Sequence, residues 1–133
     1  MSIIQLKSRF SIFLLSLLSL GFASSALSQS ETQWNGEWIA EGTLFRIGVS
    51  VADNMMQVTQ IESMGQVWTN EDGEIEGNIV RVKVDYMGAT GVIQAELLDA
   101  TTAVAFAASC APEFMVVCAL SKGRQAIFKK VAD

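Results

Sequence analysis

Histidine is absent from the 133-residue chain, and its absence excludes several kinds of chemistry. Ser-His-Asp and Cys-His nucleophile sites, histidine proton shuttles and HExxH metalloprotease helices all require an imidazole. Two cysteines without histidine cannot complete a structural zinc site. The glycine-rich loops that bind phosphate groups are missing as well. We therefore expect a protein that is not an enzyme and holds neither a cofactor nor a metal.

Positive charge is scarce, with 9 basic against 14 acidic residues and a formal net charge of −5. An acidic surface repels phosphate backbones and anionic lipid headgroups, so nucleic acid is excluded as a partner. The basic residues gather at the end of the chain. In a terminal strand they are typical of a solvated edge that discourages strand-to-strand aggregation. They are Lys122, Arg124, Lys129 and Lys130.

A run of apolar residues long enough to span a bilayer is also absent. Lys7 and Arg9 precede a serine-interrupted apolar run from Phe10 to Phe22, and small residues come after it. The run is shorter than the roughly 18 to 20 residues of a membrane span, and its order is that of a secretory signal peptide. We predict a signal peptide over residues 1–28, cleaved after Ala26 or Ser28, and an exported periplasmic or extracellular protein without a stable membrane anchor.

Residues 29–133 are predicted to form one domain, and alternation of apolar and polar residues dominates this part of the chain. The pattern is clearest over 79–86, where the apolar side chains Val80, Val82, Val84 and Tyr86 face one way. Less regular runs with turn residues between them predict further strands over 44–51, 55–61, 91–98, 102–108, 115–120 and 125–131. We predict an all-β, small antiparallel meander barrel, with a β-sandwich as the alternative, because a meander must hide its edge strands.

Gly36-Glu37-Trp38, at the start of the first strand, resembles the Gly-x-Trp opening of lipocalins and other calycin-type barrels, avidins included. The resemblance implies an up-and-down barrel. It also implies a basic residue on the last strand that covers Trp38, for which Arg124 or Lys129 could serve. The chain departs from lipocalins in its shorter length and in showing no helix after the last strand.

Cys110 and Cys118 are separated by seven residues, a gap that fits neither a redox pair nor a zinc knuckle. In an exported protein this spacing predicts a disulfide. We expect the two cysteines on adjoining strands of a hairpin that bends at residues 111–114, where Pro112 sets the backbone φ angle.

The acidic segment at 70–77 has two readings. Its four carboxylates permit a paired-carboxylate mechanism, but a solvated hairpin turn around Asp72-Gly73 is favoured. An EF-hand alignment places Trp68 and Ile79 at ligand positions, which excludes that calcium site. The carboxylates are those of Glu71, Asp72, Glu74 and Glu76.

Two candidate sites remain, and both are apolar. Small residues around Phe106 would leave room inside a barrel for a cavity lined by Trp38, Trp68, Tyr86 and Phe106, but a closed core in which these residues pack tightly is favoured. Phe114 and Met115, near the predicted bend, would form a contact patch if exposed or a plug if buried. We expect a non-enzymatic binding module for a small apolar ligand. The alternative is a cell-envelope protein-interaction factor such as a hydrolase inhibitor.

Overall fold

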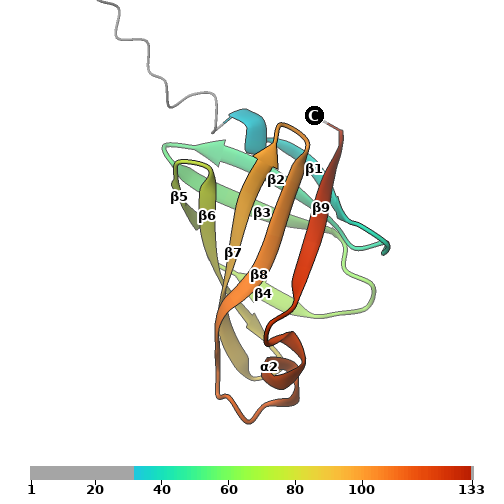
Figure 1. The fold of residues 1–133 in the computed structure, drawn as a ribbon, viewed down its shortest axis with the longest axis vertical. Helices are drawn as coiled ribbons and strands as arrows, with labels where there is room; N and C mark the ends of the chain where they lie inside the picture. Colours follow the sequence, from blue (N-terminus) through green and yellow to red (C-terminus); the bar gives the residue numbers. More distant parts are fainter. Residues whose placement is uncertain (1–31, 133) are drawn as a thin grey trace, which may run out of the picture.

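The computed structural model describes residues 32–132, so the predicted signal peptide lies outside the described residues. Strands dominate the fold (Figure 1). No helix in the described part of the chain is long and apolar enough to cross a bilayer. The elements are β1 (Gly36–Ala40), β2 (Arg46–Ala52), β3 (Met55–Glu62), β4 (Trp68–Asn70), β5 (Gly73–Glu76), β6 (Ile79–Tyr86), β7 (Ala89–Asp99), β8 (Thr102–Ala111), α2 (Val116–Ser121) and β9 (Gln125–Ala132).

The sheet closes on itself as an antiparallel barrel of eight strands with β4 as an extra strand. The order around the barrel is β5-β3-β2-β1-β9-β8-β7-β6, and β6 pairs with both β5 and β7. Every pairing is antiparallel. The predicted meander barrel is therefore confirmed, and the sandwich alternative is wrong. Closure removes most of the free edges that would otherwise recruit other strands.

The buried and exposed faces of the strands agree with the alternation of apolar and polar residues in the sequence. On β6, Val80 and Val82 are buried, whereas Arg81, Lys83 and Asp85 are exposed. The run at 89–111 forms two strands, because Asp99 turns the chain between β7 and β8. The Asp53-Asn54 turn between β2 and β3 has both residues at positive φ, a conformation that Asn and Asp tolerate better than other side chains.

The predicted hairpin turn at Asp72-Gly73 is wrong. β4 and β5 lie along the same edge of β6, and Glu71 continues the pairing through a hydrogen bond from its N–H to the carbonyl of Lys83, 3.0 Å. The hairpin bends instead at residues 77–78. Gly73 serves packing: a Cβ there would lie 2.7 Å from a methyl carbon of Val82. Glycine lets the strand approach the sheet closely.

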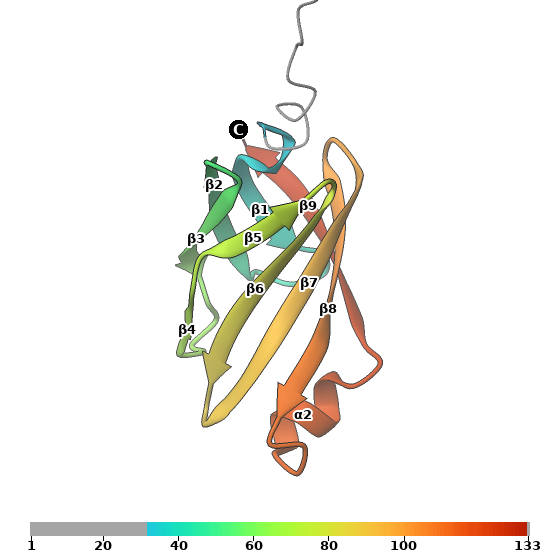
Figure 2. The same cartoon turned by 90° about the vertical axis from the view of Figure 1, so that its left-hand side faces the viewer.

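The cysteines form the predicted disulfide, but the predicted hairpin around it is wrong. Cys110 lies at the end of β8 and Cys118 on the short helix α2, with Cα atoms 5.4 Å apart. The N–H groups of Cys118 and Ala119 donate to the carbonyl of Met115, which makes the turn helical. The disulfide thus fastens α2 to the end of the barrel at which β8 ends (Figures 1 and 2).

The other end of the barrel is filled by two tryptophans. Trp34 and Trp38 are both buried, and the Nε1–H of Trp38 donates to the carbonyl of Trp34, 2.8 Å. Lys130, on β9, lies over the Trp38 ring with its Nζ 5.3 Å from the centroid. The basic residue that covers Trp38 is therefore neither Arg124 nor Lys129. Trp38 pairs with Lys130 in the β1–β9 register, and the Lys129 ammonium donates to Thr102 instead.

Candidate functional site

The barrel encloses an apolar cavity of about 440 Å³. This volume lies within the range of roughly 300 to 1,000 Å³ that is usual for small-molecule sites. Nearly all of its lining is aliphatic, aromatic or methionine side chains. The lining residues are Trp34, Trp38, Phe45, Ile47, Val49, Met56, Val58, Trp68, Val80, Val82, Val84, Tyr86, Ile93, Ala95, Ala103, Ala105, Phe106, Ala107, Ser121, Arg124, Gln125, Ala126 and Phe128.

The structure brings together all four aromatic residues that the sequence singled out. Trp38, Trp68, Tyr86 and Phe106 come from β1, β4, β6 and β8, and all four line the cavity. All four therefore lie along one cavity, and Trp38 is also part of the buried hydrophobic core. Trp68 also packs against Phe45, with ring centroids 6.0 Å apart.

Alanines create much of the space. Ala103, Ala105 and Ala107 alternate along β8 and line the cavity, and Ala95 of β7 is the register partner of Ala105. A methyl side chain at each of these positions leaves the barrel axis unfilled, whereas the larger residues of β6 and β2 stand on the other walls. The cavity is thus a consequence of residue size on two neighbouring strands.

The mouth of the cavity lies where α2 leads into β9. Arg124, Gln125 and Ala126 line the cavity and are exposed, whereas Trp34 and Trp38, which also line it, are 3% and 1% exposed. β6, β7 and β8 extend further toward the α2 end than the strands β1 to β3, which leaves that end of the barrel uneven (Figure 2). The cavity is therefore closed at the Trp34 end and open at the Arg124 end.

Two indole N–H groups in the lining are left without acceptors. Nε1 of Trp34 and Nε1 of Trp68 are both buried and have no hydrogen-bond partner in the part of the chain that the structure describes. Buried donors are nearly always paired in folded proteins. An acceptor atom on a ligand or an ordered water would satisfy them.

Phe114 and Met115 lie on a second apolar feature, outside the barrel. Phe114 is 84% exposed and Met115 is half-buried, so Phe114 is no plug over the mouth. Together with neighbouring side chains they form a groove of about 360 Å³ at the α2 end. We call this groove the apolar tip; its residues are Met87, Phe114, Met115, Val116 and Val117.

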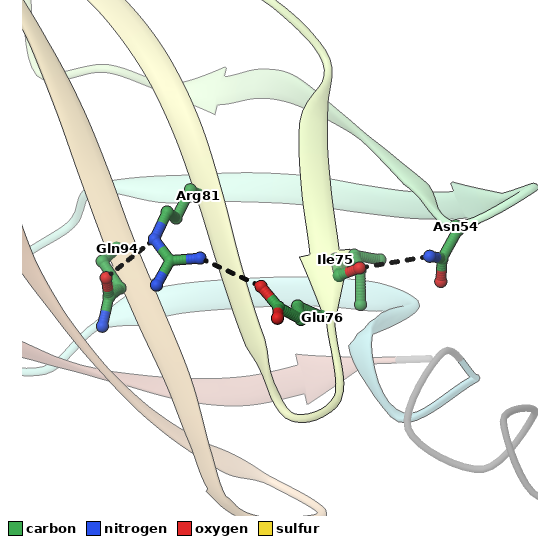
Figure 3. A network of polar contacts seen from close by, with 5 residues as sticks. All are labelled: Asn54, Ile75, Glu76, Arg81 and Gln94. Atoms are coloured by element: carbon green, nitrogen blue, oxygen red, sulfur yellow. Dashed lines mark hydrogen bonds and ion pairs between the residues drawn. The ribbon is translucent and has the colours of Figure 1, made fainter.

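The acidic segment lies on the outer wall, and none of its carboxylates lines the cavity. Glu76 on β5 forms an ion pair with Arg81 on β6, 3.4 Å, and Arg81 also donates to Gln94 on β7. These contacts link three neighbouring strands (Figure 3). Beside them, the amide of Asn54 donates to the carbonyl of Ile75 (Figure 3). Glu71 pairs with Lys83, 3.6 Å. Among residues 32–132, no group of three acidic or cysteine side chains could hold a metal ion.

Comparison with family models, curated proteins and solved structures gives no match to this chain.

Sequence reasoning missed Arg124 as a cavity residue and missed the lining role of Trp34, Phe45 and Phe128. Phe45 could have been found, because it shares the inward parity of Ile47 and Val49. Trp34 could not, because it precedes the first strand and carries no periodic signal. Arg124 stands at a turn, where alternation does not define a face.

Proposed function

We propose that this protein is an exported, non-enzymatic module that binds one small apolar ligand inside its barrel. The observation that carries the proposal is the apolar cavity of about 440 Å³, whose exposed lining residues are Arg124, Gln125 and Ala126. Burial of apolar ligand surface supplies the binding free energy. The aromatic walls, which include Trp38 and Trp68, supply shape and stacking contacts.

Export and architecture are parts of the same proposal. A disulfide between Cys110 and Cys118 fits an oxidising compartment, as does the signal-type pattern of residues 1–28. The closed eight-stranded meander is compatible with a calycin-type barrel. Lys130 over Trp38 resembles the covered tryptophan of that class, although on a different residue from the two that the sequence suggested.

The proposal is tested by filling the cavity. Ala105→Phe places a ring among the lining residues, and Ala108→Phe adds the same ring to an exposed position on the same strand. Quenching of tryptophan fluorescence by a series of lipids and aromatic compounds reports binding. We expect at least about tenfold weaker binding for Ala105→Phe and unchanged binding for Ala108→Phe, since each 1.4 kcal/mol of lost contact is tenfold.

Ala107→Phe, nearer the mouth, is the second filling variant if Ala105→Phe fails to fold. A native mass spectrum of protein recovered from its exported fraction is the complementary measurement, because it records signal cleavage and any bound mass together. Binding that is equal in the filled variants and the native chain would refute an internal site.

A second candidate function, a protein contact in the cell envelope such as inhibition of a hydrolase, is favoured by the exposure of the apolar tip. Phe114 and Val116 are 84% and 71% exposed, and side chains of this kind rarely stand together on a free surface. The test is recovery of a specific partner by the native chain and its loss in a Phe114→Ser, Met115→Ser double variant. Leu98→Ser, at an exposed position on the opposite end of β7, is the control.

A further inference from the structure

We infer that the ligand is an amphiphile with an anionic head group, such as a carboxylate on a hydrocarbon chain, and that Arg124 binds the head at the mouth while the chain fills the cavity. The inference rests on the proposed function and names the class of ligand. Its first support is the placement of polar groups. Apart from Tyr86 and the tryptophan indoles, the polar lining residues are Ser121, Arg124 and Gln125, which fall within a single segment at the mouth.

Arg124 is the one charged residue in the described lining of the cavity. No aspartate or glutamate of residues 32–132 lines the cavity, although the whole chain carries a net charge of −5. The charge of the cavity lining at the mouth is therefore positive, whereas the net charge of the protein is negative. A ligand that leaves its head at the mouth meets a cation there and no carboxylate in the described wall.

The Arg124 guanidinium has no acidic partner within residues 32–132. The ion pairs of this part of the chain use Arg46, Arg81 and Lys83. The guanidinium offers a planar set of donors that matches the two oxygens of a carboxylate. An arginine without an acidic partner at the edge of an apolar cavity is a suitable anchor for such a head group.

The backbone fixes Arg124 in this place. Gly123 takes a positive φ of 74°, and the N–H of Arg124 donates to the carbonyl of Ser121 at the end of α2, 3.1 Å. α2 is in turn held to β8 by the Cys110–Cys118 disulfide. The arginine thus stands on a closed turn between two anchored elements, which reduces the entropy that head-group binding must overcome.

A second group at the α2 end, the buried Nε1–H of Trp68, also favours a ligand with acceptor oxygens. Trp68 pairs with Tyr86 at the α2 end of β6, lines the cavity and has a buried Nε1 without a partner among the described residues. A purely hydrocarbon ligand would leave this group unsatisfied. A head group with acceptor oxygens offers it a partner.

The test compares three probes that share one hydrocarbon chain: dodecanoate, dodecanol and dodecylamine. Affinities are measured by tryptophan quenching and calorimetry for the native chain, Arg124→Gln and Lys122→Gln. Lys122→Gln removes the same charge two residues away, from a residue that does not line the cavity. Because the site is exposed, we expect the native chain to prefer dodecanoate over dodecanol by about fivefold, and dodecylamine to bind least well.

The inference is supported if Arg124→Gln abolishes this preference while Lys122→Gln keeps it. It is overturned if the three probes bind the native chain equally, or if the preference survives in Arg124→Gln; in both cases the apolar site itself stands. If none of the probes binds, the inference and the proposed function fail together. Equal melting temperatures of the two variants, both at exposed turn positions, show that folding is not the cause.

Discussion

The ammonium group of Lys130 lies 5.3 Å from the centroid of the Trp38 ring, and the same ammonium donates to the carbonyl of Gln33, 2.6 Å. One side chain of the last strand therefore holds both the first strand and the segment before it. Trp38 is 1% exposed and lines the closed end of the cavity. The contact joins the two ends of the domain at the point where the barrel is sealed.

Lys130→Met should destabilise the fold by about 1 to 2 kcal/mol, because it removes a cation–π contact and a charge-assisted hydrogen bond. Denaturant unfolding followed by tryptophan fluorescence measures the change. Lys122→Met, at an exposed position beyond α2, should leave the midpoint unchanged. An equal shift in both variants would mean that loss of positive charge, and not the Trp38 contact, is responsible.

Gly73→Ala should lower stability by about 1 to 3 kcal/mol through overpacking. A Cβ at this position would lie 2.7 Å from Val82 Cγ2 and 3.0 Å from Val80 Cγ2, both in buried residues. Gly48→Ala is the matched control, because its nearest neighbour would be the end of the Ile61 side chain at 3.4 Å, an ordinary contact distance. Thermal melting of the two variants should separate them clearly, and similar melting temperatures would contradict the close approach of β5 to β6.

Reduction of the Cys110–Cys118 disulfide should cost about 2.5 kcal/mol on the chain-entropy estimate for a loop of this length. In a domain of about 100 residues this corresponds to a fall in melting temperature of about 10 °C. Melting is recorded with and without reductant, and the Cys110→Ala, Cys118→Ala double variant serves as the control. A native chain that melts at the same temperature in both conditions would show that the bond adds nothing.

Acid should weaken the turn between β7 and β8. The backbone N–H of Thr101 donates to Asp99 Oδ1, 2.9 Å, and this bond lowers the pKa of Asp99 from its ordinary value of 3.8. A lowered folded-state pKa gives stability that is present above the ordinary value and lost as pH falls through the folded value. The melting-temperature difference between native chain and Asp99→Asn should therefore shrink below about pH 3.8. A difference that is constant from pH 7 to pH 3 would refute this role.

Strand faces were predictable from the sequence because a strand repeats every two residues and one face is buried. Val80 and Val82 are buried and Arg81 is exposed for that reason. Tyr86, on the same strand, followed from the same parity. The small residues around Phe106 suggested a cavity but could not distinguish it from a closed core, because the space that remains depends on how Ala95, Ala103 and Ala105 meet across two strands after closure.

The helical turn at the tip was not predictable in the same way. α2 has six residues, too few to show a helical repeat, and it begins with β-branched Val116 and Val117, which favour strands. Its disulfide was predictable, because the gap between the cysteines fits neither a redox pair nor a zinc knuckle and an exported protein favours the bond. A chemical constraint close in sequence is easier to predict than the backbone shape that satisfies it.

The closure of β1 on β9 has a consequence for how the protein folds. Every other seam of the barrel joins strands that lie close to one another along the chain, so this pairing closes the longest loop of the domain and has the largest loop-closure entropy of any single seam. Until β1 pairs with β9, the sheet is open and encloses no cavity. A molecule that occupies the interior binds only the closed barrel and stabilises it by mass action, so its binding opposes separation of β9 from β1.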